Sequence, residues 1–134
     1  MTKTEAIIRS IFGAAGMDIR PLAYAVDITI ELMFVRGIPM DDILVTNDVY
    51  PNVAKLLKKK ADAPPTTQAV SRRIERLAKK CWNILVKRNL VIKYIGTPLT
   101  SIRAPRDIIF YLAFYSYLDV PFFIAIERQP SLLF

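Results

Sequence analysis

The stretch at residues 66–85, TTQAVSRRIERLAKKCWNIL, decides the fold and most of the functional interpretation. At about 100° per residue, the angle that follows from roughly 3.6 residues per turn, its apolar side chains fall on one narrow stripe. A stripe of this width predicts a helix that buries one side in a protein core, with Thr66 or Thr67 as its N-cap. The stripe consists of Val70, Ile74, Leu77, Ala78, Cys81 and Leu85.

The opposite side of this predicted helix is densely cationic. Such a helix fits the major groove of DNA, where arginine can bond a guanine edge and glutamine an adenine edge, each through two bonds. Lysines near the end of the helix suit phosphates. Other interpretations remain open: RNA or another polyanion, a solvated face without a ligand, a membrane surface, or a peptide partner. The side carries Arg72, Arg73, Arg76, Lys79 and Lys80, with Gln68, Ser71 and Glu75 on one flank.

The positive charge of the whole chain is concentrated around the same helix. The chain has 134 residues, with 19 Lys plus Arg and 12 Asp plus Glu, so its net charge is +7. Residues 55–93 hold twelve basic and two acidic residues (+10), whereas the rest holds seven basic and ten acidic residues (−3). A basic middle between mildly acidic ends is typical of a surface that binds a polyanion.

The flanking sequence predicts further helices. A capping box of Thr2 and Glu5 begins the first, which ends before Gly13, and others are expected over residues 21–36, 40–46 and 52–60. Residues 90–95 are interpreted as extended, and a sixth helix is expected from Pro105 to about Leu118. Six helices with little strand signal predict an all-α domain, in which residues 51–85 form a helix-turn-helix and the fifth helix is the recognition helix.

The C-terminal part is strongly apolar. We divide the chain into a helical DNA-binding domain at residues 1–118 and an apolar extension at residues 119–134. Residues 108–126 are about as long as a membrane span, but Asp119 and Pro121 interrupt them. We therefore interpret them as a buried helix, a turn and a short extended piece, and expect no membrane partner. The extension is expected to pack on the domain or to form a dimer contact, and aromatic residues of the sixth helix to be mostly core.

The composition argues against an enzyme. With no His and one Cys, the chain has no zinc site of His or several Cys, and no Ser-His-Asp or Cys-His pair. Cys81 and Trp82 are interpreted as packing residues, and the pair Asp41 and Asp42 as helix-start acids rather than metal ligands. We expect no enzymatic activity, no cofactor and no small-molecule substrate. The single cysteine and the N-terminal pattern suit the bacterial cytoplasm, with nucleoid association when DNA is bound.

Several segments together resemble a known family. The motif Gly16-x-x-Ile19-Arg20-x-x-x-Tyr24 leads into the long second helix, and a weaker echo runs from Gly96 to Ile109. Residues 50–55, YPNVAK, are similar to the Tyr-Pro-Asp-Ile-Ala-Lys that starts the first helix-turn-helix helix of that family, and residues 70–82 to its recognition helix with a terminal Trp. The chain thus resembles, over most of residues 5–117, the C-terminal DNA-binding domain of the master response regulator of bacterial sporulation initiation.

This resemblance implies an all-helical, six-helix fold whose fifth helix enters the major groove, transcriptional control, and copies bound in tandem on DNA. Arg72 matches an arginine of the family, whereas Ala69 replaces an arginine and Ser71 a glutamate. The turn between the two helices is longer than in the family, and its Lys58, Lys59 and Lys60 are expected, with Lys79 and Lys80, to neutralise phosphates. By position, the DNA-facing residues are Gln68, Ala69, Ser71, Arg72, Arg73, Glu75 and Arg76.

Two functions follow from these observations. The first is a sequence-specific binder of double-stranded DNA that regulates transcription, as a homodimer on tandem sites. The second is a protein-interaction module that keeps the fold and has lost operator recognition. The substituted recognition surface, the lengthened turn and the apolar extension motivate this alternative.

Overall fold

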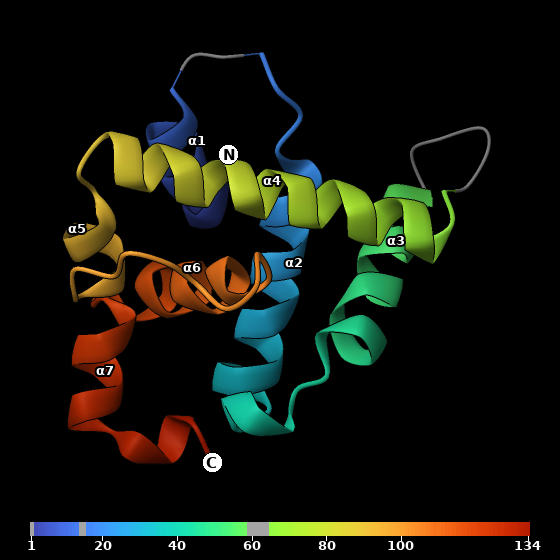
Figure 1. Cartoon of the computed structure of the whole chain (residues 1–134). Coiled ribbons are helices and arrows are strands. Elements are labelled where there is room, and N and C mark those ends of the chain that lie inside the picture. Colours follow the sequence, from blue (N-terminus) through green and yellow to red (C-terminus); the bar gives the residue numbers. More distant parts are fainter. Residues whose placement is uncertain (1, 14–15, 59–64) are drawn as a thin grey trace.

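The computed structural model describes residues 2–13, 16–58 and 65–134. Within these residues the chain is all-helical without a strand, which confirms the predicted fold class, and it forms seven α-helices rather than six (Figure 1). Short 3-10 and π-helical turns lie between them. The α-helices are α1 (Lys3–Phe12), α2 (Arg20–Ile30), α3 (Tyr50–Lys58), α4 (Thr67–Lys87), α5 (Val91–Ile95), α6 (Asp107–Leu118) and α7 (Phe122–Arg128).

Side-chain capping begins α1 and α4 where the sequence predicted. The Oγ1 of Thr2 accepts a hydrogen bond from the backbone N–H of Glu5 (3.1 Å), and the Oγ1 of Thr66 accepts one from the N–H of Ala69 (3.0 Å). Each bond satisfies a backbone donor that has no partner within the helix. α1 ends at Gly13, whose φ of +77° suits glycine. Thr66, rather than Thr67, is therefore the N-cap of α4.

Three predicted elements were wrong. In place of a helix at 40–46 there is a 3-10 turn, η2 (Met40–Asp42), and a π-helical turn, η3 (Val45–Val49), that continues into α3. Extended backbone at Ile43 and Leu44 separates them and lets Ile43 and Val45 enter the core. Residues 90–95 form the helix α5, since a helical turn, not a strand, buries Val91, Tyr94 and Ile95 together.

The expected extended piece after Asp119 is the helix α7. Its Phe122 and Ala125 are three residues apart and both buried, a spacing that puts them on one side of a helix. Pro121 stands at the N-cap with extended backbone, so it ends the preceding turn without interrupting α7.

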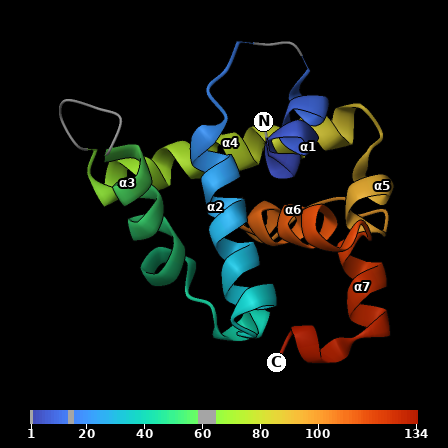
Figure 2. The ribbon, with the colours of Figure 1, turned by 180° about the vertical axis from the view of Figure 1, so that it is seen from behind.

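α2 and α6 form the centre of the molecule. α2 packs against α1, α3, α4 and α6, and α6 packs against α1, α2, α4, α5 and α7. α4 crosses the front in Figure 1, and the view from behind in Figure 2 has α2 in front of it. One side of α4 therefore lies on the core and the other faces away from it.

The C-terminal extension packs on the domain. The ring of Phe122 in α7 meets those of Tyr111 and Phe114 in α6 at centroid distances of 5.0 and 4.8 Å. Farther along, the backbone N–H of Asp41 donates to the carbonyl of Leu133 (2.8 Å). No single helix among the described residues is long and apolar enough to cross a membrane, while α6 and α7 together pass that test but are bent by 68°.

Candidate nucleic-acid interface

The predicted apolar stripe of α4 is buried. Val70, Ile74, Ala78 and Cys81 have no exposed surface, and Leu77 and Leu85 are 9% and 1% exposed. Burial raises the pKa of the Cys81 thiol to about 12, so the thiol is protonated and unreactive in the folded protein. The interpretation of Cys81 as a core residue is confirmed.

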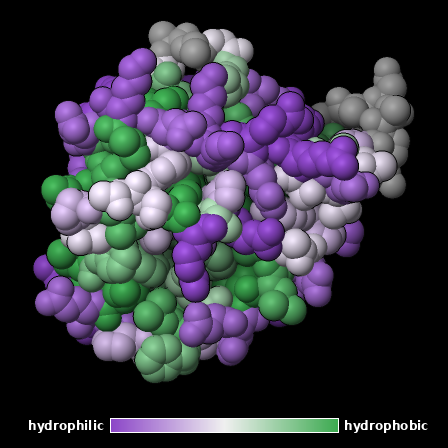
Figure 3. Space-filling model, viewed as in Figure 1, coloured by the Kyte–Doolittle hydropathy of each residue, from purple (hydrophilic) through white to green (hydrophobic). Residues whose placement is uncertain are grey.

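The opposite side of α4 presents a row of cations to solvent. Arg72, Arg76, Lys79 and Lys80 are exposed, and none of the four forms an ion pair with an acid of the described residues. We call these four residues the cationic ridge. Hydrophilic side chains gather along α4 in the space-filling view of Figure 3. The ridge can donate to anions and to base edges but cannot accept, because arginine and lysine carry donors alone.

Arg73 differs from the ridge because an acid holds it at one edge of α4. Its Nη2 lies 3.4 Å from Oδ2 of Asp18, in the segment before α2. The same carboxylate receives Nε and Nη2 of Arg20 at 2.9 and 2.8 Å. These bonds from Arg20 hold the pKa of Asp18 at about 2, so the acid stays ionised. The contact with Asp18 partly neutralises Arg73, whose side chain is 40% exposed.

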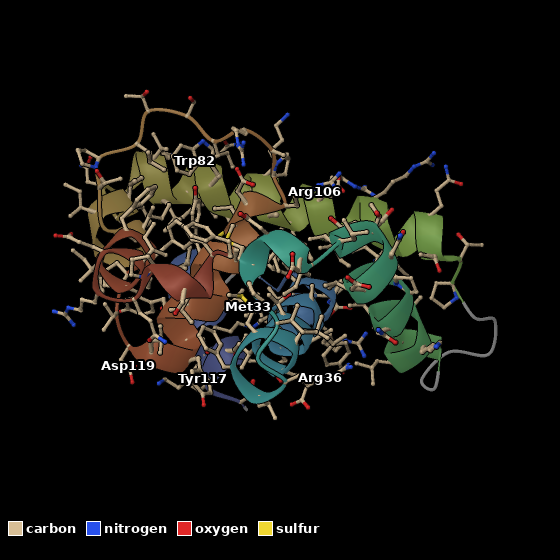
Figure 4. The ribbon with its side chains drawn as sticks, turned by 90° about the horizontal axis from the view of Figure 1, so that it is seen from below. Met33, Arg36, Trp82, Arg106, Tyr117 and Asp119 are labelled. Carbon is tan, nitrogen blue, oxygen red and sulfur yellow. The ribbon has the colours of Figure 1, made fainter. Side chains whose placement is uncertain are left out.

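Glu75 is held at the other edge of α4. The hydroxyl of Tyr50, at the start of α3, donates to its Oε2 (2.8 Å), and Nη2 of Arg106 lies 3.5 Å from the same oxygen. Burial of Tyr50, together with this bond, raises the pKa of its hydroxyl. Glu75 therefore joins α4 to α3 and to the residue that precedes α6. Figure 4 shows Arg106 beside α4.

The two remaining polar residues at the start of α4 lie near each other. Gln68 is exposed, and its backbone carbonyl accepts a hydrogen bond from the Oγ of Ser71 (2.8 Å). Ser71 is half-buried and its hydroxyl is engaged within the helix. Gln68 is thus more open to a ligand than Ser71.

The predicted lysine cluster lies mostly outside the described residues. The backbone of Lys58 ends α3, but its side chain, and the whole of Lys59 and Lys60, fall outside them. Their predicted role at phosphates stays a prediction. Trp82 is half-buried and packs against the core, which confirms its interpretation as a packing residue (Figure 4).

No functional role was predicted for Asp18 or Arg106, and Arg20 was singled out only within the family motif. Asp18 lies 55 residues before Arg73, and Tyr50 lies 25 residues before Glu75, so no local spacing indicates these pairs. In the described part of the chain, no three Asp, Glu or Cys side chains come together in a way that could hold a metal ion.

Comparisons with known proteins add no relative. No family model, no curated protein and no solved structure matches this chain. The resemblance to the sporulation regulators therefore stays a prediction that rests on the motifs quoted above.

Proposed function

We propose that the chain binds double-stranded DNA sequence-specifically through α4 and regulates transcription. The observation that carries this proposal is the cationic ridge, exposed on a helix whose other side is anchored in the core. The major groove is about 12 Å wide and admits an α-helix of about 10–12 Å diameter. A helix fixed on one side presents its other side to the groove without reorganising.

The packing around α4 supports a helix-turn-helix in which α4 is the recognition helix. α2, α3 and α4 pack on one another, and the bond between Tyr50 and Glu75 joins the start of α3 to α4. In such motifs the first helix crosses the DNA backbone while residues near the N-terminus of the second contact bases. The resemblance to the sporulation regulators suggests the same arrangement, with copies in tandem.

The roles within α4 follow from exposure and pairing. Arg72 and Arg76 reach base edges, Gln68 reads a base near the start of the helix, and Lys79 and Lys80 bind phosphates. If about five phosphates are neutralised, counting Lys58, Lys59 and Lys60, the log–log dependence of binding on salt has a slope near −4.5. Arg73 and Glu75 act by holding the two edges of α4 in place.

Selection of random duplexes by the purified protein at near-physiological salt tests the proposal. An enriched consensus supports it, and an unenriched output overturns sequence specificity. On the consensus, Arg72→Ala is expected to cost about 1–3 kcal/mol of binding free energy, and less on random DNA. Equal losses on both would make Arg72 a phosphate contact. Arg36→Ala is the matched control, because Arg36 is exposed after α2, away from α4 in Figure 4.

A second candidate function is binding of a protein partner. It is favoured by an apolar hollow of about 230 Å³ at the end of α4, lined by Val86, Asn89, Val91, Ile92, Pro98 and Leu99. Val86 and Ile92 are 45% and 61% exposed. A pull-down distinguishes this function from DNA binding. Enrichment of one protein and no DNA segment would support it, if Ile92→Glu abolishes the enrichment and Arg72→Ala does not.

A further inference from the structure

Each edge of α4 borders a shallow hollow whose far wall belongs to another element. The first hollow, of about 610 Å³, lies between α4 and the segment before α2. The second, of about 470 Å³, lies between α4 and Pro105. Arg76 lines both hollows, so its side chain lies between them.

Asp18, which lines the first hollow together with Arg73, also holds an arginine that is not among the lining residues. Arg20, the first residue of α2, makes a two-pronged contact with Asp18, and Arg73 approaches the same carboxylate from α4. The side chain of Arg20 remains 44% exposed. Because guanidinium has five N–H donors, these contacts leave donors free for a second anion.

On the opposite edge, Glu75 of α4 lines the second hollow and contacts an arginine that is not among the lining residues. Glu75 is oriented by the Tyr50 hydroxyl and lies 3.5 Å from Arg106, whose side chain remains 41% exposed. Arg103, three residues earlier, is exposed as well. Two elements outside α4 thus place an arginine near each of its edges: Arg20 is linked to Arg73 through Asp18, and Arg106 contacts Glu75 directly.

A helix in the major groove has one DNA strand on each side. Since the helix and its side chains nearly fill the groove width of about 12 Å, residues at its two edges meet different backbones. We propose, building on the function proposed above, that Arg20 and Arg106 bind phosphates on the two strands that flank α4. These two contacts raise the count from about five phosphates to about seven, and the expected salt slope from near −4.5 to near −6.3. Asp18 and Glu75 fix the direction of the guanidinium groups, and α4 reads bases between them.

Fluorescence anisotropy on consensus and random duplexes, between about 50 and 200 mM salt, tests this inference. Arg20→Ala and Arg106→Ala are each expected to weaken binding equally on both duplexes and to reduce the salt slope by about 0.9, and the double variant by about twice that. Arg20→Lys and Arg106→Lys keep the charge and should keep the slope, which separates charge loss from disturbed folding. Arg36→Ala should leave affinity and slope unchanged.

Neutral methylphosphonate linkages test the assignment to strands. With one strand neutralised along the contact, Arg20→Ala should have no further effect while Arg106→Ala keeps its full effect, and the reverse should hold for the other strand. Any one of four results would overturn the inference. These are unchanged slopes in the alanine variants, a loss of affinity confined to the consensus duplex, reduced slopes in the lysine variants, and dependence of both arginines on the same strand. If the wild-type protein binds no duplex, the proposed function itself fails.

Discussion

α4 and α6 pack against each other in the same core, yet α4 leaves one long side in solvent whereas α6 is enclosed over residues 108–114. Every residue from 108 to 114 of α6 is buried, while α4 alternates buried positions with the cationic ridge. α7 makes the difference, because its Phe122 covers a side of α6 that would otherwise be exposed. A helix that is apolar all round needs cover on every side, so α6 is suited to support and α4 to contact a ligand.

The largest expected effect separates these two roles by stability. Phe114→Ala in α6 should lower the free energy of unfolding by about 3–5 kcal/mol, because Phe114 is fully buried against Phe34 and Phe122. Arg76→Ala, on the exposed side of α4, should change it by less than about 0.5 kcal/mol. Urea unfolding of both variants measures the contrast. Similar losses in the two variants would mean that α4 and α6 do not differ as described.

The cover over α6 depends on Gly96. Gly96 has a φ of +98°, and a Cβ there would lie 3.0 Å from the Cβ of Pro121, just before α7. Gly96→Ala should therefore cost more than the roughly 1–2 kcal/mol of a left-handed backbone alone. Gly37→Ala is the matched control, since Gly37 has a φ of +74° but open space around it. Hydrogen exchange should speed up in α7 for the first variant and not for the second, and equal behaviour would contradict the close contact.

A smaller effect is expected at the start of α4. Thr66→Ala removes the N-cap hydrogen bond to Ala69 and should cost about 1 kcal/mol, with faster hydrogen exchange in the first turn. Thr67→Ala, one residue on, should change stability by less than about 0.5 kcal/mol. Reversed effects would show that the capping residue is Thr67. Because Gln68 lies in this first turn, Thr66→Ala should also weaken the contact with DNA that is proposed for Gln68.

The two helices also differ in what could be predicted from sequence. The stripe, the cap and the cationic side of α4 are local patterns, so the sequence predicted which residues are buried. α6 has apolar residues on every side and no periodicity to orient it, and the helical cover of α7 was not predicted. The contacts of Arg73 with Asp18 and of Glu75 with Tyr50 and Arg106 join distant parts of the chain, which no spacing rule reaches.

The smallest expected effect concerns Asp18, the acid that pairs with Arg73 of α4. The hydrogen bonds from Arg20 lower its pKa from 3.8 to about 2, so the folded state favours the ionised carboxylate more than the unfolded state does. Its stabilising contribution is therefore complete above pH 3.8 and is lost as the pH falls to about 2. Since the side chain is 40% exposed, solvent screening limits the contribution to at most about 1 kcal/mol.

Unfolding free energies of the wild type and of Asp18→Asn, measured from pH 5 downward, test this dependence. The unfolding free energy of the wild type should exceed that of Asp18→Asn by a constant amount near pH 5, and this advantage should shrink as the carboxylate becomes protonated. Asp41→Asn should show the same pH dependence as the wild type, because Asp41 forms no side-chain ion pair within the described residues. An advantage that persisted to pH 2 would mean that Asp18 acts through packing. Loss of this advantage in acid would show that charge holds Arg20 and Arg73 at the edge of α4, in contrast to the apolar packing that holds α6.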